Sequence, residues 1–171
     1  MPQHEFMKSE PRRPLCTLPG QKPHVNSPCM NRIEAAIAIV ARGSKVLVCQ
    51  RKDNDELGGY WEFPGGKCED GETLEQCLCR ELDEELAITA RPVARLTTIE
   101  HDYPHALIRL HPFVCVHESG EVEHKECQAS RWIDPPQLRE CRFPPANETL
   151  IEEAIAWFAT RAELVPPEAG E

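Results

Sequence analysis

Short apolar runs, each the length of a β-strand, begin at Ile33. Ile33 to Ala41 and Lys45 to Gln50 are predicted to be strands, because apolar and β-branched residues dominate them. Arg42-Gly43-Ser44 lies between them and is typical of a hairpin turn. A loop rich in Asp, Asn and Gly follows, from Asp53 to Gly59, and then a short aromatic strand from Tyr60 to Phe63. This stretch therefore predicts a hairpin followed by a third strand.

The hydrophobic period becomes helical in the segment from Thr73 to Leu86. Its leucines repeat every four residues, at Leu74, Leu78, Leu82 and Leu86. Thr73 and Gln76 have the spacing of a capping box, which marks the start of a helix. Pro64-Gly65-Gly66, upstream, is expected to end the aromatic strand.

Beyond this helix the pattern returns to strands and closes with a second helix. Strands are predicted at Ala94 to His101, His105 to His117 and Ser130 to Ile133. The apolar positions of the last helix are Ile151, Ala154, Ile155 and Phe158. The order of strands, helix, strands and helix predicts an α+β fold, an α/β/α sandwich in which helices flank a mixed sheet.

The chain has 171 residues, which suits one domain with a single sizeable core. Residues 1–31 are rich in proline and lack an apolar period, so they are expected to form a disordered tail. The folded domain is predicted to span residues 32–162, and residues 163–171 a short C-terminal tail.

Charge and cysteine content narrow the possible functions. A net charge of −10 argues against binding to duplex nucleic acid, which requires a basic face. No apolar run is long enough to span a membrane, and the N-terminus lacks the apolar core of a secretory signal, so a cytoplasmic protein is expected. The nine cysteines form no CxxC pair, which favours reduced thiols in the core over a zinc site or a disulfide framework.

Carboxylates interrupt the apolar stripe of the first helix. With Leu74 placed at zero on a helical wheel, Glu81 and Glu85 fall within roughly 20° of it, and Glu84 lies at the edge of the stripe. Carboxylates on an inward face need a counter-charge, and clustered hard oxygens are the ligands that Mg²⁺ or Mn²⁺ prefers. A solvated acidic face is the competing interpretation.

The segment around this helix resembles the signature of a known family. It contains Gly66, five residues, Glu72, seven residues, and then the run from Arg80 to Ile88. This pattern is similar to the Nudix box, the loop and helix of the Nudix hydrolases, and differs from it where Ala87 replaces the usual glycine. That position is the helix end, where glycine eases a left-handed turn.

The resemblance implies a Nudix fold, a divalent cation and a set of site residues. The implied metal ligands are the carbonyl of Gly65 and the carboxylates of Glu81, Glu84, Glu85 and Glu126. Those glutamates and Arg80 form the implied catalytic set, with Arg80 and Glu72 pairing to hold the loop on the helix. Mg²⁺ is the expected cofactor and Mn²⁺ a possible substitute. Whether Glu81 or Glu126 accepts the proton of the attacking water stays open.

The similarity extends beyond the box to the MutT-like branch of the family. The segments Trp61 to Lys67 and Phe143 to Glu148 carry it. The residues that it implies for substrate binding are Arg51, Phe63, Pro64, Lys67 and Asn147. The Asn147 amide presents an acceptor beside a donor, so it could read the altered edge of 8-oxoguanine; alternatively, Asn147 caps the last helix.

These expectations describe a hydrolase of phosphoric anhydrides that acts on a small nucleotide, as a monomer or a homodimer. Hydrolysis of 8-oxo-dGTP to a monophosphate and pyrophosphate, which sanitises the nucleotide pool and serves DNA repair and replication, is the first hypothesis. Hydrolysis of CTP, dCTP or a modified pyrimidine nucleotide is the second. A nucleotide-sensing module without turnover is the third, and the retained glutamates argue against it.

Overall fold

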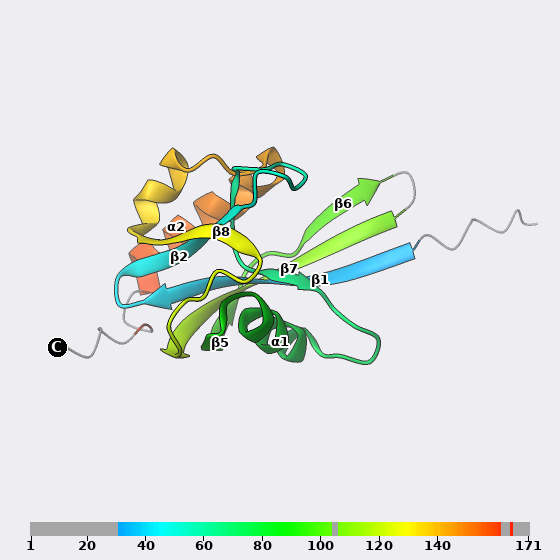
Figure 1. The fold of residues 1–171 in the computed structure, drawn as a ribbon, viewed down its shortest axis with the longest axis horizontal. Helices are drawn as coiled ribbons and strands as arrows, with labels where there is room; N and C mark the ends of the chain where they lie inside the picture. Colours follow the sequence, from blue (N-terminus) through cyan, green and yellow to red (C-terminus); the bar gives the residue numbers. More distant parts are fainter. Residues whose placement is uncertain (1–30, 104–105, 162–164, 166–171) are drawn as a thin grey trace, which may run out of the picture.

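The computed structural model describes residues 31–103, 106–161 and 165. Over these residues the chain forms one mixed sheet with a helix on each face (Figure 1). The predicted α+β sandwich is thereby confirmed. No helix in these ranges is long and apolar enough to cross a membrane.

The bounds of the elements follow in chain order. The strands are β1 (Asn31–Arg42), β2 (Lys45–Arg51), β3 (Trp61–Glu62), β4 (Gly65–Lys67), β5 (Thr89–Arg95), β6 (Ile99–Tyr103), β7 (Ala106–Ser119) and β8 (Cys127–Ile133). The α-helices are α1 (Leu74–Leu86) and α2 (Glu148–Arg161), and the 3₁₀ helices are η1 (Pro135–Glu140) and η2 (Pro145–Asn147).

Strand β1 is at the centre of the sheet. The main path runs β3-β2-β1-β7-β5, while β4 pairs with β1, β6 with β7 and β8 with β2. Only the β1–β7 pair is parallel among the pairings of the described strands. Because β4 adds to β1, the sheet carries the start of the Nudix-like segment directly on its central strand.

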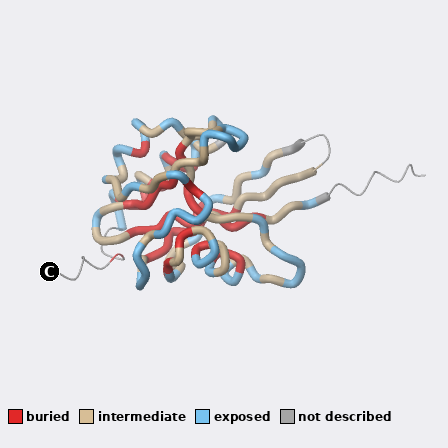
Figure 2. Tube along the Cα trace, in the orientation of Figure 1, coloured by how far each residue is buried: buried red, intermediate tan, exposed pale blue. Residues whose placement is uncertain are grey.

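The alternation of side chains along β1 builds both layers of the core. Ala36 and Ala38 pack with the leucines of α1, whereas Ile39 and Ala41 pack with the apolar face of α2. Figure 2 shows the buried residues concentrated where the helices cover the sheet. The small residues on the first face let α1 approach the sheet closely.

Helix α1 begins and ends as its sequence predicts. Thr73 caps it, Gln76 completes the capping box, and Ala87 ends it in the left-handed conformation at φ 55°. A non-glycine residue in this conformation costs about 1 kcal/mol. The departure at Ala87 therefore leaves the geometry of the helix end intact.

Four expectations from the sequence need correction. The strand predicted from Ala94 to His101 falls on two strands, β5 and β6. Residues 96–98 separate them, and there the amide and hydroxyl of Thr97 donate to Glu153. Gly65 to Lys67 does not merely end a strand but pairs with β1. Asn31 belongs to β1, and Val165, assigned to the tail, is buried against the core. The rest of both predicted tails lies outside the described residues.

Candidate active site

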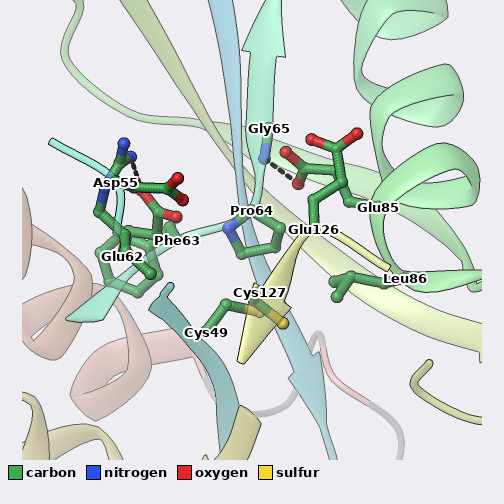
Figure 3. Close-up of a pocket in the computed structure, with 11 residues that line it drawn as sticks. Cys49, Asp55, Glu62, Phe63, Pro64, Gly65, Glu85, Leu86, Glu126 and Cys127 are labelled. Atoms are coloured by element: carbon green, nitrogen blue, oxygen red, sulfur yellow. Dashed lines mark hydrogen bonds and ion pairs between the residues drawn. The ribbon is translucent and has the colours of Figure 1, made fainter. Parts of the chain in front are cut away.

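A small hollow opens beside the C-terminal end of α1 and has a volume of about 140 Å³. Its lining residues are Cys49, Arg51, Asp55, Glu62, Phe63, Pro64, Gly65, Glu85, Leu86, Glu126 and Cys127. Figure 3 shows the carboxylates of Glu85 and Glu126 close together on one side, Asp55 and Glu62 on the other, and Pro64 between them. The structure thus brings together six of the residues that the sequence predicts, namely Arg51, Phe63, Pro64, Gly65, Glu85 and Glu126.

Backbone pairing brings Glu126 to Glu85. The amide of Lys125 donates to the carbonyl of Glu85 at 3.2 Å, and the Lys125 ammonium donates to the carbonyl of Asp83 at 3.0 Å. The amide of Glu123 donates to the carbonyl of Leu86. The loop before β8 therefore bonds to carbonyls in the last turn of α1, and this contact sets the position of Glu126.

Glu85 lies in an environment that disfavours its charge. Burial raises the pKa of Glu85 to about 8, and the nearby carboxylates of Glu81, Glu62 and Glu126 contribute to this rise. The amide of Gly65 donates to Glu85 Oε2 at 3.1 Å and lowers the pKa in part. A buried carboxylate whose anionic form is disfavoured in this way is a site where a bound cation would be strongly favoured.

Arg80 organises the other charged residues of the helix. Its guanidinium donates twice to Glu72, through Nε to Oε1 and Nη2 to Oε2 at 2.9 Å each, and Nη1 donates to Glu81 at 2.9 Å and Glu84 at 3.0 Å. The bonds from Arg80, and then that from the amide of Glu69, lower the pKa of Glu72 to about 2. The predicted Arg80–Glu72 pair is present, and Arg80 also holds two of the predicted metal ligands.

Gly66 allows the Glu81 carboxylate to approach the loop. A Cβ built on Gly66 would lie 2.5 Å from the carboxyl carbon of Glu81. The neighbouring Gly65 has φ +134°, and a Cβ there would lie 2.2 Å from the carbonyl oxygen of Ala36. Gly65 is therefore required both by its conformation and by the backbone of β1, whereas a side chain at position 66 would displace the Glu81 carboxylate.

Lys67 and Asn147 lie outside this hollow. Lys67 faces a larger one of about 570 Å³, lined also by Arg32 and Glu72, and its ammonium bonds to no other described residue. Asn147 ends η2, and its side chain makes no hydrogen bond within the described ranges, so the cap interpretation lacks its bond. Phe143, four residues before Asn147, packs on Phe63 with ring centroids 5.1 Å apart.

The predicted metal ligands divide into two groups. Glu85 and Glu126 line the hollow, while Glu81 and Glu84 are bonded to Arg80. No three His, Cys, Asp or Glu side chains of the described part are already arranged to hold a metal ion. The donor set nevertheless fits a hard divalent cation, since it consists of carboxylates and one of them has a raised pKa in the hollow.

Sequence reasoning missed several residues that line the hollow. Glu62 lies between the buried Trp61 and Phe63, and a lone polar residue in an aromatic strand is a signal that could have identified it. Asp55 belongs to a loop rich in Asp, Asn and Gly in which no pattern distinguishes it from its neighbours. Cys49 and Cys127 meet at the base of the hollow on the paired strands β2 and β8.

Comparison with known proteins places this geometry in a family. The model of the NUDIX domain matches residues 35–153. The chain is 34% identical over 132 residues to the CTP pyrophosphohydrolase of Escherichia coli (strain K12), covering 77% of this chain and 98% of that relative. It is 41% identical over 92 residues to the 8-oxo-dGTP diphosphatase of Proteus vulgaris, covering 54% of this chain and 82% of the relative.

Among solved structures, the solution structure of the E. coli ORF135 protein matches with a TM-score of 0.70 at 34% identity, covering 77% of this chain and 94% of that one. The family match spans most of the described domain. The chain belongs to the NUDIX domain family, and the resemblance inferred from its loop and helix is confirmed.

Proposed function

We propose that this NUDIX-family enzyme is a Mg²⁺-dependent nucleoside triphosphate pyrophosphohydrolase whose preferred substrate is 8-oxo-dGTP. The chain is a hydrolase of phosphoric anhydrides, in line with its family. The reaction adds water across the bond between two phosphates and releases a nucleoside monophosphate and pyrophosphate. The carboxylate-lined hollow that includes Arg51 carries this proposal. Its carboxylates can bind a metal ion, and the Arg51 guanidinium can bind a phosphate group in the same place.

Each residue has a separate part in this reaction. Glu85, Glu126 and the Gly65 carbonyl would hold the cation. Glu81 and Glu84, which are bonded to Arg80, would be its further ligands. When bound, the cation neutralises phosphate oxygens and lowers the pKa of a water. Glu126 is the better acceptor for the water's proton, since it lines the hollow while Glu81 is bonded to Arg80.

The free amide of Asn147 supports 8-oxoguanine as the base. 8-Oxoguanine presents a donor at N7 beside the O6 acceptor, whereas guanine presents two acceptors. An amide that is not used as a helix cap can pair with the first pattern and is mispaired with the second. A relative at 41% identity is named 8-oxo-dGTP diphosphatase, which agrees with this assignment.

Cytosine nucleotides are the second candidate. The relative named CTP pyrophosphohydrolase matches over 98% of its own length. The two candidates share the phosphate chemistry and differ only in how the base is bound.

Steady-state hydrolysis of 8-oxo-dGTP, dGTP, dCTP and CTP with Mg²⁺, followed by pyrophosphate release, tests the proposal. We expect kcat/KM for 8-oxo-dGTP to exceed that for dGTP by roughly 10² to 10⁴-fold. Asn147→Ala should remove most of this ratio, and Thr149→Ala, an exposed position in the first turn of α2, should preserve it. Higher kcat/KM for CTP or dCTP would select the second candidate. Absence of hydrolysis of all four nucleotides would overturn both.

A further inference from the structure

The charges in the hollow are unbalanced for an enzyme that binds a polyanion. Arg51 is the one cation among the described lining residues, and it faces four carboxylates, those of Asp55, Glu62, Glu85 and Glu126. A bound cation accounts for Glu85 and Glu126. It does not account for Glu62, which lies on the opposite side of Pro64 in Figure 3.

Glu62 is one of two groups that fix the guanidinium of Arg51. Arg51 Nη1 donates to Glu62 Oε2 at 2.6 Å, and Arg51 Nε donates to the carbonyl of Glu56 at 2.8 Å. Both charged side chains are only 32% exposed. A charge-assisted bond of this length in a partly buried site defines the orientation of the donor well. Nη2 of Arg51 bonds to no described residue, so its N–H groups remain available for a ligand.

The backbone holds Glu62 rigidly in place. Its strand β3 pairs with β2 so that Glu62 is opposite Cys49, and Arg51 lies two residues farther along β2 on the same face. The neighbours Trp61 and Phe63 are buried in the core. Burial raises the pKa of the Glu62 carboxyl even against Arg51, so the fold keeps a costly carboxylate at this point.

We propose that Glu62 is a positioning residue that holds Arg51 toward the phosphate chain of the nucleotide. This inference rests on the proposed function and deepens it. Without Glu62, Arg51 can turn to Asp55 or to the carboxylates of the metal side, and it is then lost to the substrate. Arg51 lies on β2 and Glu62 on β3. The pairing of these strands therefore sets the distance between Arg51 and the carboxylates of Glu85 and Glu126 on the other side of Pro64.

The sign of one substitution separates this role from a simple effect of charge. If Glu62 acted only as a negative charge near a polyanion, Glu62→Gln or Glu62→Ala would lower KM. Positioning predicts the opposite: Glu62→Ala should raise KM for 8-oxo-dGTP and dCTP about tenfold with a smaller change in kcat. Glu62→Gln keeps an acceptor oxygen and should raise KM less. Asp55→Asn is the matched control, because it removes one charge from the same hollow without breaking a bond to Arg51, and it should not raise KM.

A double-mutant cycle tests whether Glu62 acts through Arg51. In an Arg51→Ala background, Glu62→Ala should raise KM no further, because the group that it positions is gone. An equal rise in both backgrounds, or a lower KM for Glu62→Ala alone, would overturn the inference. Circular dichroism and Tm of each variant check folding, and Glu62→Gln retains the shape if Glu62→Ala does not fold. Absent turnover in the unsubstituted enzyme would overturn the proposed function, whereas normal turnover with unchanged KM in the Glu62 variants overturns this inference alone.

Discussion

The loop and helix from Glu72 to Leu86 contain two regions that differ in how the charges of their glutamates are compensated. Around Arg80, the carboxylates of Glu72, Glu81 and Glu84 share one guanidinium, and the pKa of Glu72 falls to about 2. One turn farther along, burial and neighbouring carboxylates raise the pKa of Glu85 to about 8. Glu72, in the loop that leads into α1, is therefore stabilised as an anion, whereas Glu85, near the end of α1, is destabilised as one.

This difference separates a structural frame from a reactive site. A carboxylate with a guanidinium partner contributes order to the loop and helix without needing a ligand. A buried carboxylate among other carboxylates is stabilised by protonation or by a cation. The region around Glu85 is consequently where we expect a divalent cation, and the Arg80 region is what holds the ligands near it.

Substitution of Glu85 should have the largest effect on activity. Glu85→Gln removes a central ligand while keeping the shape of the side chain, and we expect kcat to fall about 10³-fold. Glu75→Gln, an exposed position in the first turn of the same helix, is the control and should leave kcat within a factor of about two. Steady-state kinetics with saturating Mg²⁺ measures both. If the kcat of Glu85→Gln were within tenfold of that of the original enzyme, the distinction between a reactive region at Glu85 and a structural region at Arg80 would be wrong.

Substitution of Arg80 should have a smaller effect, because Arg80 acts through the ligands that it holds. Arg80→Gln leaves Glu72, Glu81 and Glu84 without their cation, and we expect kcat/KM to fall about 10 to 100-fold with a lower Tm. Arg91→Gln breaks an exposed ion pair with Glu118 and is the control for loss of a surface cation. Equal losses in the two variants would show that Arg80 has no special role.

The contact between Gly66 and Glu81 gives a steric test. Gly66→Ala places a Cβ against the Glu81 carboxylate, so Glu81 must move and kcat/KM should fall about tenfold. Glu81→Asp shortens the side chain and relieves that contact. The combined variant should therefore be no worse than Glu81→Asp alone, and additive losses would contradict the steric explanation.

The smallest expected effect is on the pH dependence of stability without metal. The folded-state pKa of Glu85 is raised from 4.5 to about 8, so protonated Glu85 stabilises the fold below about 4.5, and this contribution is lost as pH rises to about 8. Glu72 has the opposite sign: its contribution is present above 4.5 and is lost as pH falls toward about 2.

Thermal unfolding in EDTA between pH 2 and 9 measures these slopes. Glu85→Gln should flatten the decrease between pH 5 and 8 and leave the acid limb unchanged. Mg²⁺ at pH 8 should raise the Tm of the original protein by a few degrees, which is the effect expected of a ligand present at tens of times its Kd. The Tm of Glu85→Gln should rise less. Identical curves for the two proteins would place the titrating group elsewhere.

The residues of the candidate site could be predicted in part. The positions of those that were not predicted correctly depend on strand pairing. Gly65 and Glu85 are implied by the resemblance of the loop and helix, and Arg51 by the longer resemblance to the MutT-like branch. The structure brings all three to one hollow. Lys67 was expected to join them, but the β4 pairing with β1 turns it toward a different hollow. Glu62 was not predicted at all, because its partner Arg51 is eleven residues away and meets it only through the pairing of β2 and β3.

The sequence by itself determined both α-helices, most of the strands and the family. The four-residue leucine repeat, the Thr73 cap and the charged positions of the box are local patterns, and α1 forms as they predict because helix period and capping depend on near neighbours. Only the tertiary structure decided the charge state of the site. Whether a glutamate is an anion or close to neutral depends on burial and on groups brought from β3, β4 and the loop before β8, which no local pattern encodes.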